Sequence, residues 1–290
     1  MPELPEVETI RRDLNRVLKG KKITRVEVRK AKMVRGSVRA FERELRGRHV
    51  EFLRRRGKLL IVGLRGTDRY LLVHLKMTGQ LIYRDGAGQV AGGHGYPLVE
   101  ELPNKYSHVI FYFAGGGKLY FNDMRQFGYM KIVDEKGLAG VLSKFGMEPL
   151  ARAFTREFLT QVLRGRKTAV KNVLLDQSKI AGLGNIYADE VCFAAGIRPT
   201  RQAQRVTQKE AARLHCAIGK VLRQAVKERG TTFGSYRDGL GGEGNFVRRL
   251  KVYQRTGKKC WRPGCRQAGV TIKRVAVGGR STHYCHKCQT

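Results

Sequence analysis

The stretch VEFLRRRGKLLIVGLRGTDRYLLVHL, residues 50–75, decides the fold class of this 290-residue chain. Its apolar runs are short and rich in β-branched residues, and glycine and charged residues separate them, as is typical of strands joined by tight turns. Comparable runs extend from Ile23 to about Val133, with Gly-rich turns such as AGGGK, residues 114–118, between several of them. We therefore expect an antiparallel β-sandwich or barrel-like domain. Within it, RDGAGQVAGGHGYP, residues 84–97, is interpreted as a surface loop insertion with no core of its own.

Helical patterns flank this β region. Before it, apolar residues recur at helical spacing over residues 5–19, and Gly20 ends the pattern. After it, four further helices are expected at residues 155–163, 169–177, 186–195 and 207–227, followed by a Gly-rich stretch at 230–246. The sequence therefore predicts an α+β protein, with an N-terminal helix plus an antiparallel β-sandwich domain, then a helical domain and a C-terminal cysteine hairpin.

The net charge indicates a polyanionic partner. The chain has 58 Lys+Arg against 24 Asp+Glu, a formal charge of +34. The basic residues are spread over the whole chain, which indicates a large binding surface rather than an accessory arm. Nucleic acid fits best. An acidic membrane surface is the alternative, disfavoured because the chain has no lipidation signal and no basic amphipathic terminal helix. Since no apolar run approaches ~20 residues and no signal peptide is recognisable, we expect a cytoplasmic protein.

Four cysteines near the C-terminus form a metal-binding pattern. They are spaced Cys260-x4-Cys265-x19-Cys285-x2-Cys288. Four thiolates on a segment too small for its own core suit one structural, tetrahedral Zn²⁺ ion, because no position is left open for catalysis. Disulfides are the alternative, but they do not suit a reducing compartment. The other two thiols, Cys192 and Cys216, fall within helical patterns and are expected to be ordinary buried cysteines.

Several motifs recur in order along the chain. They are MPELPEVE at the start, RRGKLL (55–60), HLKMTG (74–79), NDMRQFG (122–128), GMEPL (146–150), LLDQSKIAGLGNIYADE (174–190) and the cysteine hairpin. This set resembles the formamidopyrimidine-DNA glycosylase family, enzymes that remove oxidised purines from DNA. GNIYADE looks like that family's helix-two-turn-helix DNA-binding element. The chain departs from the family pattern at Met124, at Gln126 and in the Cys260–Cys265 spacing, which is four rather than the frequent two.

The resemblance implies chemistry at the N-terminus. Removal of the initiator methionine, favoured by the small Pro2, leaves Pro2 with a free secondary amine as the catalytic nucleophile. Glu3 matches the family's general acid, and Glu6, one helical turn further on, is expected to orient Glu3 or the amine. The alternative for both acids is to cap the helix. Lys58 matches a catalytic lysine near the scissile phosphates, with a solvated turn lysine as the alternative. Arg280 matches an arginine implicated in the second elimination.

The resemblance also implies a DNA-binding set. Its members are Met77, Arg125, Phe127, Asn185, Tyr106, Arg166 and Lys171. The first three match the triad that fills the gap left by a flipped nucleotide, although Met77 and Phe127 alone would be interpreted as core residues. Asn185, at the start of a helix, is expected to bind phosphate, with a plain N-cap as the alternative.

Three segments follow from the resemblance: a catalytic domain at 1–136, a helix-two-turn-helix domain at 137–250 with a lesion-covering loop at 230–246, and a zinc-finger hairpin at 251–290. We expect a nucleoid-associated, monomeric base-excision repair enzyme. Its partner is double-stranded DNA containing oxidised purines or abasic sites, and it combines glycosylase activity with β,δ-elimination through a Schiff base on Pro2.

Two alternatives remain open. The endonuclease VIII type favours oxidised pyrimidines, but its N-terminus usually begins PEGPE rather than PELPE. A non-enzymatic zinc-containing DNA-binding protein would account for the charge and the cysteines, but it leaves the Pro2-Glu3 terminus unexplained.

Overall fold

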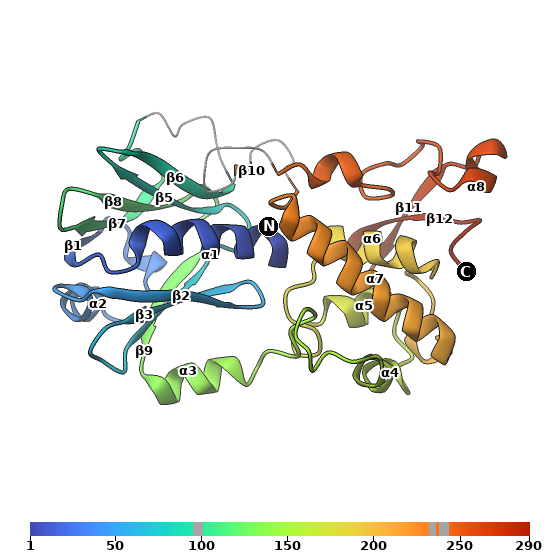
Figure 1. Cartoon of the computed structure of the whole chain (residues 1–290), viewed down its shortest axis with the longest axis horizontal. Helices are drawn as coiled ribbons and strands as arrows, with labels where there is room; N and C mark the ends of the chain where they lie inside the picture. Colours follow the sequence, from blue (N-terminus) through green and yellow to red (C-terminus); the bar gives the residue numbers. More distant parts are fainter. Residues whose placement is uncertain (95–100, 232–235, 238–243) are drawn as a thin grey trace. The chain divides into compact units, whose positions relative to one another are not determined.

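The chain forms two compact units (Figure 1). The computed structural model describes residues 1–94, 101–231, 236–237 and 244–290. The first unit contains Met1–Ser143 and Val226–Val247, and the second contains Lys144–Ala225 and Arg248–Thr290. Residues 226–247 were expected to belong to the helical domain, whereas they return to the first unit. Within the described ranges, no helix is long and apolar enough to cross a membrane.

Two antiparallel sheets build the first unit. The four-stranded sheet has the order β2-β3-β4-β9, formed by Val50–Arg56, Leu59–Leu64, Tyr70–His74 and Tyr129–Val133. The six-stranded sheet has the order β1-β7-β8-β5-β6-β10, formed by Ile23–Val28, Ser107–Phe113, Lys118–Asp123, Gly79–Asp85, Gly88–His94 and Tyr236–Arg237. Every residue of β3 is buried, which explains its unbroken apolar sequence. The prediction of an N-terminal antiparallel β domain is therefore confirmed.

Helix α1 (Leu4–Leu18) lies against both sheets. It contacts β2 and β3 of one sheet and β6 of the other (Figure 1). The apolar side chains of α1 belong to one continuous core with residues of both sheets. Its first turn is capped from within, because the Glu6 carboxylate accepts the N–H of Glu3, the N-cap residue, at 2.8 Å. Gly20, with φ of +83°, follows its end.

The structure corrects two predictions in the β region. Residues 84–94 are not an unstructured insertion, because β6 pairs with β5 from Gln80↔Gly93 to Asp85↔Gly88, and residues 95–97 lie outside the described ranges. Their Gly-rich sequence lacks apolar alternation, yet its backbone completes the ladder. Helix α2 (Val38–Leu45) was also missed; Ser37 caps it by accepting the N–H of Ala40.

The second unit is helical with one hairpin. Its helices are α4 (Arg156–Leu163), α5 (Val170–Leu175), α6 (Asn185–Ala195), α7 (Gln208–Lys227, whose last two residues belong to the first unit) and α8 (Pro263–Gln267). The hairpin joins β11 (Ile272–Val277) to β12 (Arg280–Cys285). Helix α3 (Glu135–Leu142) ends the first unit's N-terminal segment, and short 3₁₀ turns occupy Ala31–Met33, Ala203–Arg205 and Phe246–Arg249. The predicted order of a β domain, helices and a cysteine hairpin is confirmed.

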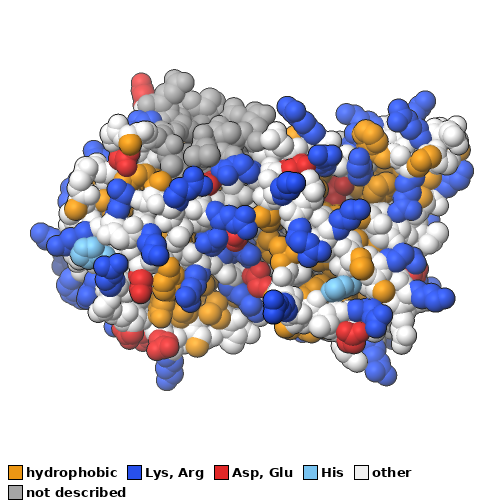
Figure 2. All heavy atoms as spheres, in the orientation of Figure 1, with side chains coloured by type: hydrophobic (Ala, Val, Ile, Leu, Met, Phe, Trp, Pro, Cys, Tyr) orange, Lys and Arg blue, Asp and Glu red, His pale blue; other side chains and the backbone are white. Residues whose placement is uncertain are grey.

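Basic side chains are distributed as the composition predicts. On the face drawn in Figure 2, Lys and Arg side chains cover much of both units, with few Asp and Glu side chains between them. On this face, positive charge is therefore spread over both units rather than confined to one tail.

The core position of α1 generates the first testable prediction. Leu14 is fully buried, so Leu14→Ala should lower the free energy of unfolding by roughly 2–5 kcal/mol, because it removes packing and leaves a cavity. Urea unfolding followed by circular dichroism measures this. Val17→Ala, at a half-buried position on the same helix, is the matched control and should cost about 1 kcal/mol or less. Equal losses for the two variants would contradict the central role of this helix.

Candidate functional site

The start of the chain lies among buried charges. Glu3 and Glu6 are only 3 % and 2 % exposed. Burial lowers the pKa of the terminal ammonium group on Met1; Lys58 and Arg125 act in the same direction, and Glu3 and Glu6 oppose them. A lowered pKa increases the fraction of neutral amine at neutral pH. The structure thus brings the first turn of α1, the β2–β3 turn and the loop after β8 together around the terminal amine.

Glu6 joins the helix start to a distant segment. One carboxylate oxygen accepts the N–H of Glu3, and the other accepts the N–H of Thr231, both at 2.8 Å. Gly230 has φ of +86°, and a Cβ there would lie 2.7 Å from the Glu6 carboxylate, so only glycine fits. Pro2, which precedes Glu3 in the chain, is also buried. Glu6 is therefore a positioning residue for both segments, in addition to being a helix cap.

A second buried acid of α1 holds the same segment. Asp13, 2 % exposed, forms an ion pair with Arg229, whose φ of +62° is unusual for a residue with a side chain. Asp13 and Glu6 are seven residues apart and therefore lie on the same helix face. Neither Asp13 nor Arg229 belongs to a sequence motif, so neither was predicted as a site residue.

Lys58 is not a solvated turn lysine. It occupies the two-residue β2–β3 turn with Gly57, which has φ of +54°, and it is only 5 % exposed. The turn is fixed by Arg55, which donates to the carbonyl of Gly57 at 3.0 Å and to the carboxylate of Glu8 at 3.1 Å. The solvated alternative for Lys58 is therefore wrong.

Met77 and Phe127 are exposed rather than part of the core. Met77 is 39 % and Phe127 54 % exposed, and the Arg125 guanidinium carbon lies 4.9 Å from the centre of the Phe127 ring. Thr78 ties the two loops together: its hydroxyl accepts the N–H of Arg125 at 2.9 Å and donates to the Asp123 carboxylate. The structure thus presents two apolar side chains and one cation on braced loops.

Backbone geometry at these loops is strained. Lys76 and Gln126, which immediately precede the two exposed apolar residues, have φ of +50° and +57°. The backbone is also crowded, because a Cβ on Gly79 would lie 2.4 Å from the carbonyl oxygen of Leu75. Such strain persists only where surrounding contacts fix the conformation, so these loops hold a defined shape.

His74 supports the first of these loops. Burial lowers its pKa to about 3, and the charges of Lys76 and Lys58 act in the same direction. The ring is therefore neutral at physiological pH, and its Nδ1 accepts the N–H of Lys76 at 3.0 Å. His74 belongs to the HLKMTG motif, and its structural part was not foreseen.

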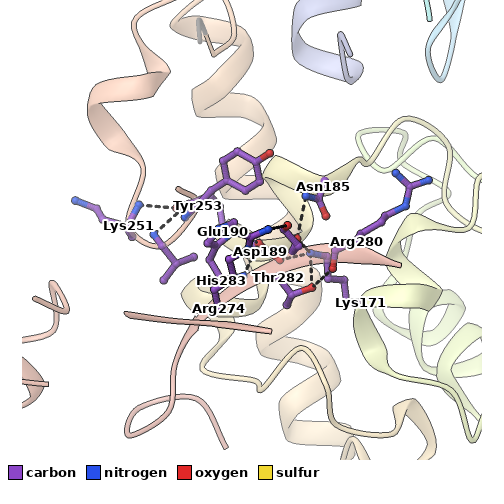
Figure 3. A network of polar contacts seen from close by, with 12 residues as sticks. Lys171, Asn185, Asp189, Glu190, Lys251, Tyr253, Arg274, Arg280, Thr282 and His283 are labelled. Carbon is purple, nitrogen blue, oxygen red and sulfur yellow. Dashed lines mark hydrogen bonds and ion pairs between the residues drawn. The ribbon is translucent and has the colours of Figure 1, made fainter. Parts of the chain in front are cut away.

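In the second unit, Lys171 is buried in a polar network (Figure 3). Its ammonium lies 2.6 Å from the Asp189 carboxylate and donates to the Ser281 carbonyl at 2.9 Å and to the Thr282 hydroxyl at 2.8 Å. Lys171 and Asp189 are both 0 % exposed. The ammonium therefore has two hydrogen-bond acceptors and one buried counter-charge. This arrangement contradicts the prediction that Lys171 contacts DNA directly; it positions β12 instead.

Asp189 and Asn185 complete this network. The second oxygen of Asp189 accepts the N–H of His283 at 2.8 Å, and the amide of Asn185 donates to the Ser281 carbonyl at 3.0 Å (Figure 3). Gly184 is the N-cap of α6, so Asn185 is not the plain N-cap that was its alternative. Three side chains of α5 and α6 therefore hold the backbone of β12.

Arg280 is exposed beside this network. It is the first residue of β12 and follows the two-residue turn Gly278-Gly279, whose φ values of +54° and +72° fit a tight hairpin turn. A Cβ on Gly278 would lie 2.5 Å from the side chain of Asn172. The hairpin tip is thus packed in place while Arg280 faces solvent.

The remaining predicted residues are only partly exposed. Tyr106 is half-buried, and its carbonyl accepts the N–H of Asp123 at 3.1 Å. Arg166, in the second unit, is half-buried and donates to the carbonyl of Val162 at 2.6 Å. Most of the predicted lesion-covering loop, residues 232–235 and 238–243, lies outside the described residues.

The four C-terminal cysteines converge. Their sulfur atoms all lie within 4.8 Å of one another, and the pairs Cys260–Cys288 and Cys265–Cys285 are each 3.8 Å apart. Four sulfurs about 2.3 Å from one tetrahedral Zn²⁺ ion are separated by about 3.8 Å, so the donor set fits a metal ion. All four are free thiols, and the disulfide alternative is not observed. Of the other two thiols, Cys192 is buried as predicted, whereas Cys216 is exposed.

The buried pair in the second unit generates a prediction. Lys171→Met should lower the free energy of unfolding by roughly 3–5 kcal/mol, because it leaves the buried Asp189 carboxylate without its cation. Combining it with Asp189→Asn should recover part of this loss. Arg156→Met removes an exposed ion pair with Glu157 and should cost about 1 kcal/mol or less. Urea unfolding compares the four proteins, and a double variant no more stable than Lys171→Met would contradict the pairing.

Comparison with known proteins agrees with this geometry. A model of the formamidopyrimidine-DNA glycosylase N-terminal domain matches residues 1–130, and a model of the formamidopyrimidine-DNA glycosylase H2TH domain matches residues 145–236. A formamidopyrimidine-DNA glycosylase of Pelotomaculum thermopropionicum is 44 % identical over 293 residues, covering 100 % of this chain and 99 % of that protein.

Two solved structures of the Lactococcus lactis protein are similar throughout. One is a variant bound to DNA containing Fapy-dG, with 32 % identity, a TM-score of 0.88 and complete coverage of both chains. The other is a complex with DNA containing an abasic site, with 32 % identity, a TM-score of 0.87 and 99 % coverage of both. With two family domains matched in order and relatives aligned from end to end, this chain belongs to the formamidopyrimidine-DNA glycosylase family.

Proposed function

We propose that this chain removes oxidised purines, such as 8-oxoguanine and formamidopyrimidines, from double-stranded DNA and then cleaves the abasic strand. The observation that carries the proposal is the start of the chain, where buried Pro2 adjoins the buried side chains of Glu3 and Glu6, in the unit that also buries Lys58 and presents Met77 and Phe127. A purely DNA-binding protein has no use for a terminal amine of lowered pKa beside a buried carboxyl group.

The chemistry starts after removal of Met1, which transfers the free amine to Pro2. The Pro2 nitrogen attacks the deoxyribose C1′, the bond from C1′ to the base breaks, and Glu3 supplies a proton for base departure and ring opening. The resulting iminium withdraws electrons, so the C2′ proton is lost and the bond to the 3′ phosphate breaks. A second elimination releases the 5′ phosphate. Lys58 lies near the amine and is assigned to the scissile phosphates.

Reaction at C1′ requires the nucleotide to leave the base stack. Met77 and Phe127 are assigned to fill the gap, and Arg125 to address the orphaned base, because all three lie on braced loops. In the second unit, Asn185 and Arg280 are assigned to phosphates, with Arg280 assisting the second elimination. Arg166 and Tyr106 remain proposed DNA contacts.

The lesion class rests on the family and on the PELPE start. The similar Lactococcus lactis protein was solved with DNA containing Fapy-dG, an abasic site and an oxidised pyrimidine, which supports damaged bases and abasic sites as substrates and leaves the purine preference to the PELPE start. The endonuclease VIII alternative predicts a preference for oxidised pyrimidines. Duplexes containing 8-oxoguanine opposite cytosine or thymine glycol separate the two, and faster excision of thymine glycol would overturn the purine assignment.

The nucleophile is tested by borohydride trapping on lesion-containing DNA. A permanent N-terminal extension places the Pro2 nitrogen in a peptide bond without changing any side chain, so the trapped adduct should disappear. The unextended protein is the control, and intact mass should show that Met1 is absent from it. Trapping by the extended protein, or full activity with Met1 retained, would contradict the assignment.

The Glu3→Gln variant tests the role of the Glu3 carboxyl group independently of the Pro2 amine. The variant keeps the Pro2 amine, so it should still be trapped on DNA that already contains an abasic site. Excision of 8-oxoguanine should fall by about 10²–10⁴-fold, since protonation of the leaving group is lost. Equal losses on both substrates would show that Glu3 supports the fold rather than the reaction.

We also propose that the cysteine cluster holds one structural Zn²⁺ ion. The ion would organise the hairpin that carries Arg280 and would take no part in the chemistry. The purified protein should contain one zinc per chain, and chelation should change the emission of Trp261, the only tryptophan, which follows Cys260. A zinc-free protein with unchanged emission and unchanged DNA binding would refute the proposal.

A further inference from the structure

The only tryptophan of the chain is exposed next to the cysteine cluster. Trp261 is 43 % exposed and lies between Cys260 and Cys265, in the four-residue spacer that exceeds the frequent spacing of two. A hollow of about 120 Å³ beside it is lined by Trp261, Cys260, Arg255, Lys259 and Arg266. Neither the proposed reaction nor the metal cluster uses this side chain.

Three cations surround the indole ring. The Lys251 ammonium lies 4.0 Å from its centre, and the guanidinium carbons of Arg255 and Arg266 lie 5.2 Å and 6.0 Å away. From residue 244 to the end, the chain contains no Asp or Glu. Within the described part of the chain, no acidic side chain pairs with these three cations, and the buried Nε of Arg255 has no hydrogen-bond partner. The cluster therefore carries uncompensated positive charge and an unused donor.

The framework beneath this cluster is rigid. The Glu190 carboxylate of α6 accepts the N–H groups of Lys251, Val252 and Tyr253, each at 2.9 Å. Gln254, immediately before Arg255, has φ of +54°. Arg262, the residue after Trp261, donates to the carbonyl of Phe193 at 2.8 Å. Such preorganisation reduces the entropy lost when a ligand binds.

The composition of the cluster favours nucleic acid over a protein partner. The core of a protein interface is depleted in charged residues, whereas this hollow sets one aromatic ring among several cations with no acidic side chain. Single-stranded nucleic acids are bound by aromatic rings that stack on bases, together with cations that follow the phosphates. In an intact duplex the base faces are covered, so an exposed ring can stack only on an unpaired base.

We propose that Trp261 with Lys251, Arg255 and Arg266 forms an accessory site for single-stranded DNA. The ring stacks on one unpaired base, and the three cations bind the adjoining phosphates. The site goes beyond the proposed excision reaction, which acts on a nucleotide in a duplex, and it does not depend on that reaction being correct.

Because Trp261 is the only tryptophan, its fluorescence reports directly on the site. A short oligothymidylate, titrated into the full-length zinc-loaded protein, should quench the emission in a saturable manner. Inorganic phosphate and polyglutamate at the same charge concentration test simple anion binding and an acidic protein partner. No quenching by the oligonucleotide, or equal quenching by either control, would overturn the proposal.

Substitutions at Trp261 and at the neighbouring arginines measure the contributions of ring stacking and of positive charge to binding. Trp261→Ala should weaken binding of a labelled oligothymidylate about tenfold, and Trp261→Phe by about threefold or less, because the smaller ring still stacks. Arg255→Ala combined with Arg266→Ala should weaken quenching of Trp261 by a similar factor. Lys220→Ala, an exposed cation on α7, is the matched control. Zinc content and circular dichroism establish that each variant is folded, and a folded Trp261→Ala protein with unchanged affinity would refute the site.

Discussion

The Glu6 carboxylate is the contact on which the first unit depends. Its two oxygens accept N–H groups of Glu3 and Thr231, the second of which is 225 residues further along the chain. One buried side chain thereby caps the helix that leads to the terminal amine and fixes the start of the returning segment. Because a buried carboxylate that loses a hydrogen bond is costly, the two segments are coupled. Asp13, seven residues further along the same face of α1, makes a second contact with this segment through its ion pair with Arg229.

In the second unit, buried carboxylates of α6 likewise accept hydrogen bonds from the backbone of distant segments. Asp189 holds the backbone of β12 and Glu190 holds the backbone at residues 251–253. Burial raises the pKa of Glu190, although the three N–H donors act in the opposite direction. Several of the few acids of this basic chain are thus used internally, on backbone groups and on buried Lys171. Most cations of this chain, whose formal charge is +34, therefore have no acidic partner, which favours binding to a polyanion.

The sequence predicts the strands well, since their apolar runs reflect a local requirement that each buried strand must satisfy. It also predicts the cysteine cluster, because metal ligation fixes residue type and spacing. The sequence does not predict a residue's role where that role depends on a contact with a distant part of the chain. Lys171 resembles a phosphate ligand until Asp189 is found beside it, and no sequence pattern indicates that Arg229 and Thr231 contact α1. Residues 84–94 form a strand because neighbouring strands offer hydrogen bonds, which no property of a Gly-rich segment reveals.

Left-handed backbone conformations occur next to several of the proposed site residues. Four non-glycine residues in the described ranges have φ in the left-handed region: Lys76, Gln126, Arg229 and Gln254. The first two precede Met77 and Phe127, the third precedes the Gly230–Thr231 junction with Glu6, and the last precedes Arg255 beside Trp261. Each conformation costs of order 1–3 kcal/mol, which ordinary turns avoid by using glycine. Surrounding contacts must therefore hold each of these conformations. The Trp261 cluster shares this backbone feature with the loops that carry Met77 and Phe127, although no family motif includes it.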